Sequence, residues 1–519
     1  MSTHPEREHY DAHVNRIARG AGISFVGQGM GRIFTYATQV ALAWMYGPAQ
    51  LGFYVLAITL VELTNVLSQF GMDNGVVRYV AYYRAEKDAS KVRGTILLAL
   101  VAPFALSMVI ACLIFFSAGF LAGGVFHKPP LETMFKVFSV SLPFLTVMNM
   151  ALYATVGFKT VKYLIYVQQV IQPVVSFTLI VVFYLLGAQI MGAAAAYVIS
   201  TVAGSLAALY YLKRMFPRLT DRNSSTEFET RKLLNHSWPL IISNVTQRIN
   251  SWTAVTVLGI FATASAVGIY NAAARTAVLS ALVLFAFNGI FSPIISSLYR
   301  KNLMEDLSRL YKDVSRWVFS GAFAIFLITM LLGRDILEIL GPQFVSGWVV
   351  LVAIALAQLF NSSVGPTQRI LAMTRHQTVL MMATAGSAVI GVAANFILVP
   401  MYGVLGAGIA TAAAIFLMNV ISLLAVRRLL GFWPYSREYV RPIAAGTLAA
   451  IGVYLAKLEF PFTSPIPTVL VFSSLFLALF AVLLLAFGLS PSDRKFLTPL
   501  WETFQRGTTR LRARAVRGS

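Results

Sequence analysis

Fourteen long apolar windows constrain this 519-residue chain more than any other feature. Each window is about 20 residues or longer, which is the length that a helix needs to cross the hydrocarbon core of a bilayer. Inside that core every backbone N–H and C=O must be bonded within its own segment, so the windows predict helices. Charged residues make up 12% of the chain, against about 25% in soluble domains. We therefore expect an all-α polytopic membrane protein, with spans near 22–46, 50–72, 94–122, 134–156, 162–187, 190–212, 237–262, 267–294, 315–333, 347–371, 377–400, 404–426, 440–458 and 466–488.

The sequence also repeats itself, without gaps, at an offset of 216 residues. Leu-Gly-Phe-Tyr at 51–54 returns as Val-Gly-Ile-Tyr at 267–270, and Tyr-Arg at 83–84 returns at 299–300. Six expected spans separate the two copies, and an even number of crossings preserves the orientation of a helix in the membrane. The repeat thus predicts two pseudo-symmetric six-helix lobes, related by an axis along the membrane normal and followed by two extra C-terminal helices.

The connection after the sixth span reads as a linker between these lobes. It is polar and contains Pro217 and the run Asn223-Ser224-Ser225, residue types that are typical of loops. The expected division is an N-tail over 1–21, an N-lobe over 22–215, a linker over 216–236, a C-lobe over 237–430, the two extra helices over 431–489 and a basic C-tail over 490–519.

The distribution of basic residues predicts the orientation. Of the 41 lysines and arginines, 34 fall in the two tails and in the connections on the same side of the membrane or at the span ends beside them, four fall in or beside the connections on the other side, and three lie well inside spans. Cytoplasmic segments carry the excess of Lys and Arg in membrane proteins. We therefore expect both termini in the cytosol. The N-terminal stretch is polar and lacks a small-residue cleavage site, so we interpret it as a tail and not as a signal peptide.

Polar side chains recur on single faces of several expected spans. In the first span Gln28 and Arg32 are four residues apart, and the repeat places Asn244 and Arg248 at the equivalent positions of the seventh span. The candidate substrate-binding residues are Arg32, Arg248, Arg275, Gln28, Asn244 and Asn271. Because polar groups cannot face acyl chains cheaply, these faces should line a shared wet cavity between the lobes.

The three arginines inside spans need an explanation. Each costs about 2.5–3.5 kcal/mol at the centre of a bilayer helix on insertion scales. One interpretation is structural, with each guanidinium paired to a carboxylate or to helix carbonyls. The other is a cationic cavity for an anionic substrate, because the guanidinium is a rigid, permanently charged fork that suits phosphate. Cations outnumber acids within the spans, which favours the second interpretation.

Two acidic residues, Glu62 and Asp73, lie in or beside the second span. They are candidates either for an ion pair with one of those arginines or for a site that couples transport to protons or sodium. The lone Cys112 excludes an intramolecular disulfide, and no Cys/His cluster has the spacing of a metal site. We therefore expect no catalytic residue, no metal and no cofactor.

Three segments carry a resemblance to a known superfamily. They are the Gly-x-Tyr openings of the second and eighth spans, the stretch from Phe70-Gly71-Met72 to Val77-Arg78-Tyr79, and the stretch from Ser292-Pro293 to Leu298-Tyr299-Arg300. With the fourteen spans, they resemble the multidrug/oligosaccharidyl-lipid/polysaccharide exporter superfamily, and within it the Wzx-type polysaccharide or O-antigen flippases. The resemblance implies two lobes in a V that open alternately to the two sides. It also implies that the last two spans form a lateral groove for a lipid tail.

The same resemblance implies a substrate and a setting. The substrate would be an oligosaccharide on polyprenyl (undecaprenyl) pyrophosphate, moved across the bacterial cytoplasmic membrane for surface polysaccharide biosynthesis, O-antigen or exopolysaccharide. Arg275 matches an arginine that lipid II flippases share in their eighth span. Those flippases tend to have Arg-Asp in the first span, whereas Ile33 follows Arg32 here, which disfavours a lipid II role. The implied partners are membrane lipids, a polysaccharide polymerase and other assembly proteins, with no nucleic acid.

Other functions stay open as alternatives. A lipid II flippase and a cation-coupled multidrug exporter would share this fold, although the exporter would need acidic residues in its cavity to attract cationic drugs. A membrane-bound glycosyltransferase or polymerase is disfavoured, because no connection between spans is long enough to hold a catalytic domain. We therefore expect a transporter and not an enzyme.

Overall fold

The computed structural model describes the backbone of residues 5–221 and 225–488. It describes their side chains except at 5–30, 32–33, 220, 235–236, 238–244, 246–247, 250–251 and 289–290. The described chain is helical throughout its ordered elements, and ten of its helices are long and apolar enough to cross a membrane. The expected all-α polytopic fold is confirmed.

Most of the expected spans fall on a single helix of the structure, whereas 162–187, 267–294 and 347–371 each extend over more than one element. The first half contains α1 (Pro5–Gln69), α2 (Met72–Ala85), α3 (Ala89–Phe120), η1 (Leu121–Val125), α4 (Leu131–Gly157), α5 (Lys162–Ile165), η2 (Tyr166–Ile171), α6 (Gln172–Leu185), α7 (Ile190–Met215) and η3 (Pro217–Thr220). The second half contains α8 (Thr230–Phe261), α9 (Ala264–Ala277), η4 (Val278–Ala281), α10 (Leu282–Arg300), α11 (Met304–Leu340), η5 (Pro342–Gly347), α12 (Trp348–Ser363), α13 (Thr367–Met373) and α14 (Gln377–Leu430). It is followed by η6 (Arg437–Tyr439), α15 (Val440–Glu459) and α16 (Pro465–Ala486).

Two of these helices each hold two expected spans. In α1 the break between the spans is Gly47, whose φ of 74° is a left-handed conformation that favours glycine, and Pro48 follows it. In α14 the break is Gly403, with φ 55°. At each break the backbone leaves the helical conformation, so α1 and α14 each consist of two helices joined at a kink.

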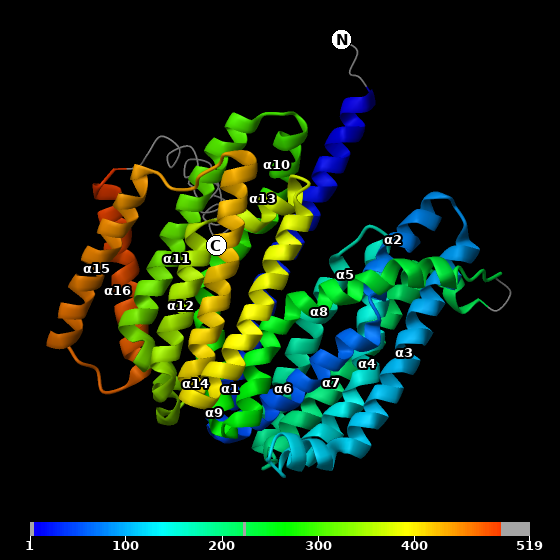
Figure 1. The fold of residues 1–519 in the computed structure, drawn as a ribbon, viewed down its shortest axis with the longest axis horizontal. Helices are drawn as coiled ribbons and strands as arrows, with labels where there is room; N and C mark the ends of the chain where they lie inside the picture. The colour runs from blue at the N-terminus through cyan, green and yellow to red at the C-terminus, as the bar shows by residue number, and fades with distance from the viewer. Residues whose placement is uncertain (1–4, 222–224, 489–519) are drawn as a thin grey trace, which may run out of the picture.

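The two halves lie side by side and diverge toward one end of the molecule. In Figure 1 the first half (blue to cyan) occupies the right side, the second half (green to yellow) the left, and α15 with α16 (orange to red) the far left edge. The ribbons of the halves approach each other around α9 and the kink of α1 and separate toward α2 and α10. We call the first of these ends the junction end and the second the linker end.

The closest approach at the junction end is made by two glycines that the repeat relates. A Cβ on Gly52 would lie 1.8 Å from the carbonyl oxygen of Ala264, and a Cβ on Gly268 would lie 2.0 Å from that of Pro48. The offset of 216 converts Gly52 into Gly268 and Pro48 into Ala264, so these are two copies of one contact. We call this pair of contacts the glycine junction. It requires glycine because the neighbouring atoms belong to backbone and cannot rotate away.

The pair α15–α16 is fastened to α11 near both of its ends. Lys457 in α15 forms a salt bridge of 2.5 Å with Asp335 in α11. On the other side, Arg316 of α11, 3% exposed, forms a salt bridge with Glu438 in η6, immediately before α15. The two terminal helices are therefore attached to the second half of the molecule.

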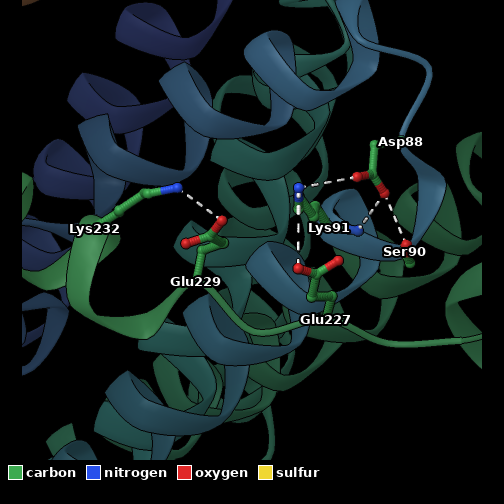
Figure 2. Close-up of polar contacts among 6 residues, drawn as sticks. All are labelled: Asp88, Ser90, Lys91, Glu227, Glu229 and Lys232. Atoms are coloured by element: carbon green, nitrogen blue, oxygen red, sulfur yellow. Dashed lines mark hydrogen bonds and ion pairs between the residues drawn. The ribbon is translucent and has the colours of Figure 1, made fainter.

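The connection between the halves is attached to the first half (Figure 2). At the start of α3 the side chain of Asp88 accepts hydrogen bonds from the backbone N–H of Lys91, at 3.0 Å, and from the Ser90 hydroxyl, at 2.7 Å. These donors, the backbone N–H first, hold the pKa of Asp88 below its usual value. The Lys91 ammonium lies 3.4 Å from Asp88 and 3.9 Å from Glu227, a residue of the connection.

Backbone contacts reinforce this attachment. The N–H of Glu227 donates to the carbonyl oxygen of Ser90 at 3.3 Å. A Cβ on Gly94 would lie 1.9 Å from the carbonyl oxygen of Glu227, so only glycine permits the connection to lie this close to α3. As a result, α8 begins on the first half and ends against α14 of the second half, and it crosses between the lobes.

Candidate functional site

A polar cavity of about 380 Å³ lies where the two halves meet. Its described lining residues come from α1, α4, η2, α6 and α7 of the first half and from α8 and α9 of the second half. They are Thr35, Thr38, Gln39, Leu42, Leu51, Tyr54, Val55, Ile58, Glu62, Asn65, Leu145, Met148, Asn149, Tyr153, Gln168, Gln169, Gln172, Pro173, Ser176, Tyr197, Ser200, Arg248, Asn271 and Arg275. An interior of this kind suits a polar ligand that enters the membrane plane.

Three of the six candidate binding residues line this cavity, and they come from both helices of the second half that border it. Arg248 lies in α8, and Asn271 and Arg275 lie four residues apart in α9. Both arginine side chains are exposed to the cavity, and neither forms a salt bridge with any residue that the structure describes. Two guanidinium groups, neither in a salt bridge with a described residue, thus face one polar space that one carboxylate, Glu62, also lines.

The other three candidates, Gln28, Arg32 and Asn244, have side chains outside the described residues. The structure gives only their backbone, in α1 and α8.

The two acidic candidates occupy different places. Glu62 lines the cavity, whereas Asp73 lies in the first turn of α2 and is not among the lining residues. Glu62 forms no salt bridge with Arg248 or Arg275. Its carboxylate accepts a hydrogen bond of 3.1 Å from the Trp252 indole N–H instead. The role of Glu62 in ion coupling stays a prediction.

Trp252 joins two groups of opposite charge, and it was not predicted from the sequence. Its indole N–H donates to Glu62 on α1, while the Arg248 guanidinium carbon lies 5.9 Å from the centre of its ring. A cation over an indole face is attracted by the ring quadrupole. Trp252, which is 7% exposed, therefore holds a carboxylate of the first half and a cation of the second half at the cavity edge.

The repeat relates this contact to a second one between the halves. Tyr36 is equivalent to Trp252 at the offset of 216, and its hydroxyl lies 3.1 Å from the hydroxyl oxygen of Thr276 in α9. The Thr276 hydroxyl itself donates to the Ala272 carbonyl at 2.8 Å, so the tyrosine is the donor. One aromatic donor from each lobe thus reaches across to the other lobe.

Most of the neutral amides that line the cavity lie on its first-half wall. Thr146 donates to the Asn65 side-chain oxygen at 3.0 Å, and the Gln168 amide donates to the Asn149 side-chain oxygen at 2.8 Å. The amides of the fourth and fifth spans were not among the candidates predicted from the sequence. The signal that could have found them is the occurrence of Gln168, Gln169 and Gln172 within one apolar window.

By its fold and its site, the protein is a two-lobed, multi-pass helical membrane protein with a polar cavity between its lobes. Residues 17–299 match the family described as polysaccharide biosynthesis protein, and the chain belongs to that family. The resemblance seen in the sequence, to polysaccharide flippases of the exporter superfamily, is confirmed.

Two curated relatives come from the archaeon Haloferax volcanii. The chain is 31% identical to probable flippase AglR over 220 residues, which are 39% of this chain and 42% of the relative. It is 26% identical to probable low-salt glycan biosynthesis flippase Agl15 over 192 residues, which are 37% of this chain and 40% of the relative. The chain thus spans about two fifths of the length of the curated relatives it matches.

Solved structures share the fold at low sequence identity. The lipid II flippase MurJ in an inward closed conformation superposes with a TM-score of 0.71 at 14% identity, over 89% of this chain and 98% of that one. An inward-facing multidrug resistance transporter of the MATE family superposes with a TM-score of 0.66 at 17% identity, over 77% and 94%. These likenesses establish the architecture.

Proposed function

We propose that this protein is a flippase that moves an oligosaccharide linked to polyprenyl (undecaprenyl) pyrophosphate across the cytoplasmic membrane for surface polysaccharide biosynthesis. The observation that carries the proposal is the pair Arg248 and Arg275, which face one polar cavity and form no salt bridge with a residue that the structure describes. A pyrophosphate would supply the missing negative charge. Guanidinium groups bind its oxygens through paired, charge-assisted hydrogen bonds.

The position of the cavity supports alternating access. It lies at the junction of the two halves, so a change in their relative tilt would move its opening from one side of the membrane to the other. The pyrophosphate and sugars would occupy the polar cavity, while the acyl chain stays in the lipid. Translocation of this kind makes and breaks no covalent bond, so the function needs no catalytic residue.

The membrane and the partners belong to the same proposal. The distribution of basic residues supports cytosolic N- and C-termini in a bacterial cytoplasmic membrane. Proton or sodium coupling would use Glu62, the one acidic residue among the described cavity residues. A polysaccharide polymerase and other assembly proteins would receive the flipped lipid for O-antigen or exopolysaccharide synthesis.

The lipid II flippase is the second candidate, and the superposition with MurJ over 89% of the chain favours it at the level of the fold. Residue chemistry in the first span opposes it, because Ile33 stands where an aspartate would be expected beside Arg32. A cation exporter receives less support, since two cations and one carboxylate are the charged groups among the described lining residues.

The test is to replace the arginines and measure glycan export in a deletion strain complemented by each variant. Each lost charge-assisted hydrogen bond should weaken binding about 10- to 150-fold, so Arg248→Ala and Arg275→Ala should each impair export. Arg369→Ala is the matched control, because Arg369 is exposed and does not line the cavity. Normal export by the triple variant of Arg32, Arg248 and Arg275 at wild-type protein levels would overturn the proposal.

A further inference from the structure

The two walls of the cavity differ in chemistry. Both described cations come from α8 and α9. The first-half wall carries six uncharged amides. One of them, Gln39, donates to the backbone carbonyl of Asn271 in α9. We call the other five the amide cluster: Asn65, Asn149, Gln168, Gln169 and Gln172. Phosphate recognition accounts for the cationic wall and leaves the amide cluster without a role.

Three of these amides lie in or directly after a local irregularity of the fifth span. The residues from Tyr166 to Ile171 form a π-helical turn, and α6 begins at Gln172, directly before Pro173. Proline removes a backbone N–H and so favours such a break in the regular ladder. Here Gln168, Gln169 and Gln172 all line the cavity.

The π-helical turn packs against α1 at Gly31. A Cβ on Gly31 would lie 2.2 Å from the side-chain oxygen of Gln169, 2.8 Å from its Cβ and 3.0 Å from its Cα. The absence of a side chain at position 31 is therefore what allows the π-helical turn to pack this close to α1. Gly31 has no functional group, but its small size determines where the Gln169 amide lies in the wall of the cavity.

The amides retain hydrogen-bonding capacity toward the cavity. Gln168 and Asn149 spend one N–H and one lone pair on the bond of 2.8 Å between them. Each amide side chain has two N–H groups and one carbonyl oxygen, so three N–H groups and the Gln168 oxygen of this pair remain able to form further hydrogen bonds. Gln172 donates weakly to the Thr201 hydroxyl at 3.4 Å. Donors and acceptors are thus interleaved on an uncharged surface.

We propose that the amide cluster is a sugar subsite, which binds the hydroxyl or acetamido groups of the pyrophosphate-proximal saccharide. This inference rests on the proposed function, and it assigns a separate role to each wall of the cavity. The arginines would hold the charged pyrophosphate from one side, and the amides would recognise the neutral sugar from the other. Sugar hydroxyls both donate and accept, as amides do, and a wall that bonds them discriminates strongly against ligands that lack them. The cluster would thus determine glycan specificity.

The experiment compares two probes on the purified full-length protein in nanodiscs. One probe is undecaprenyl pyrophosphate, and the other is the glycan-bearing lipid extracted from the host's own deletion strain. The quantity measured is the ratio of the two dissociation constants, which isolates the contribution of the sugar. The variants are Gln168→Leu, Gln172→Leu and Gly31→Ala. The control is Thr178→Leu, because Thr178 lies on the same helix and is exposed outside the cavity.

The wild-type protein should bind the glycan-bearing lipid more tightly. Each glutamine variant should reduce that advantage about 2- to 12-fold, the range for one neutral hydrogen bond, and leave the affinity for undecaprenyl pyrophosphate unchanged. Gly31→Ala should act in the same direction without removing any polar group, and Arg275→Ala should weaken both probes equally.

Three results would contradict the subsite. An unchanged ratio in all three variants would remove the cluster from sugar recognition. An equal loss for both probes would assign the amides to the pyrophosphate or to folding, and the proposed function would stand. Failure of the wild-type protein to bind either lipid would overturn the subsite and the proposed function together.

Discussion

Adding one methyl group at the glycine junction should push the two lobes apart. We consider Gly268→Ala and Gly52→Ala, which the repeat relates. The added Cβ would lie 2.0 Å from the Pro48 carbonyl oxygen in the first case and 1.8 Å from the Ala264 carbonyl oxygen in the second. Non-bonded carbon and oxygen atoms do not approach within 3.0 Å in real structures. The backbones of α1 and α9 must therefore separate by about 1 Å or more.

The magnitude follows from the cost of overpacking. Inserting a methyl group into a packed contact costs typically about 1–3 kcal/mol. That cost applies only to conformations in which the junction is closed, so it should shift the equilibrium about 5- to 150-fold toward conformations that are open at the junction end. One movement relieves both contacts. The double variant should therefore shift the equilibrium by less than the product of the single shifts.

The assay is a distance measurement between spin labels at Gln189 and Gln343 on the Cys112→Ser background. Both positions are exposed and lie at the junction end, in the α6–α7 connection and in η5. Cys112 is the one native cysteine, so its replacement leaves two labelling sites. We expect the glycine variants to populate a longer distance that is minor in the wild-type protein.

Gly386→Ala is the control, since Gly386 lies in α14 with no neighbouring atom within 4 Å of an added Cβ. It should leave the distance distribution unchanged. A wild-type distribution for both junction variants, with folded protein recovered in normal amounts, would refute the assignment of the junction as the contact that closes this end.

Three further predictions concern Trp252, the Arg316–Glu438 ion pair and Asp88, and each has its own measurement. Trp252→Phe removes the indole N–H but keeps a ring under Arg248. It should shift the equilibrium between the closed and open conformations more than it weakens the binding of undecaprenyl pyrophosphate. Trp252→Leu removes both contacts and should impair both. Arg316→Ala leaves Glu438 without its buried partner and should lower the unfolding temperature, measured in detergent, by more than Glu438→Gln does. Asp88→Ala should reduce amide protection at the start of α3, measured relative to the intrinsic exchange rate. The protection of the wild-type protein should fall toward that of the variant as the pH drops below about 4. The pKa of Asp88 is lowered in the folded state, so its stabilising contribution is present above its ordinary pKa and is lost at lower pH.

Each of these predictions has a contradicting result. Equal loss of binding in Trp252→Phe and Trp252→Leu would mean that the ring does not support Arg248. An unfolding temperature unaffected by Arg316→Ala would remove this ion pair from the attachment of α15 and α16. Amide protection at the start of α3, measured relative to the intrinsic exchange rate, that is the same at all pH values and in Asp88→Ala would show that the carboxylate does not stabilise the helix start.

The general architecture could be predicted from the sequence because the bilayer imposes simple rules. A membrane helix needs a long apolar window, and the repeat at 216 residues specifies which helices are equivalent. It could also be predicted from the sequence that Arg248, Asn271 and Arg275 surround one cavity, because the polar faces of membrane spans must avoid lipid. These inferences depend on local composition and periodicity, which a single sequence contains.

Other parts of the site depend on contacts between distant segments. The π-helical turn at 166–171 arises where Pro173 follows and where Gly31 permits close packing, and neither residue alone signals it. Trp252 reads as an ordinary apolar residue until Glu62, 190 positions away, is seen to accept its N–H. The attachment of the linker to α3 likewise needs Gly94 beside Glu227. Pairings of this kind are set by three-dimensional packing and leave no periodic trace in the sequence.

The central claim is that this protein carries a pyrophosphate-linked glycan from the cytosolic leaflet to the outer one. The most direct measurement is mass spectrometry of polyprenyl-linked glycans from a deletion strain, with the leaflet assigned by a membrane-impermeant sugar-modifying probe. We predict an oligosaccharide linked to polyprenyl pyrophosphate that accumulates on the cytosolic face. It should be released by the wild-type protein but not by a variant in which Arg248 and Arg275 are both Ala. A lipid-linked pool unchanged in amount and in leaflet would contradict the account.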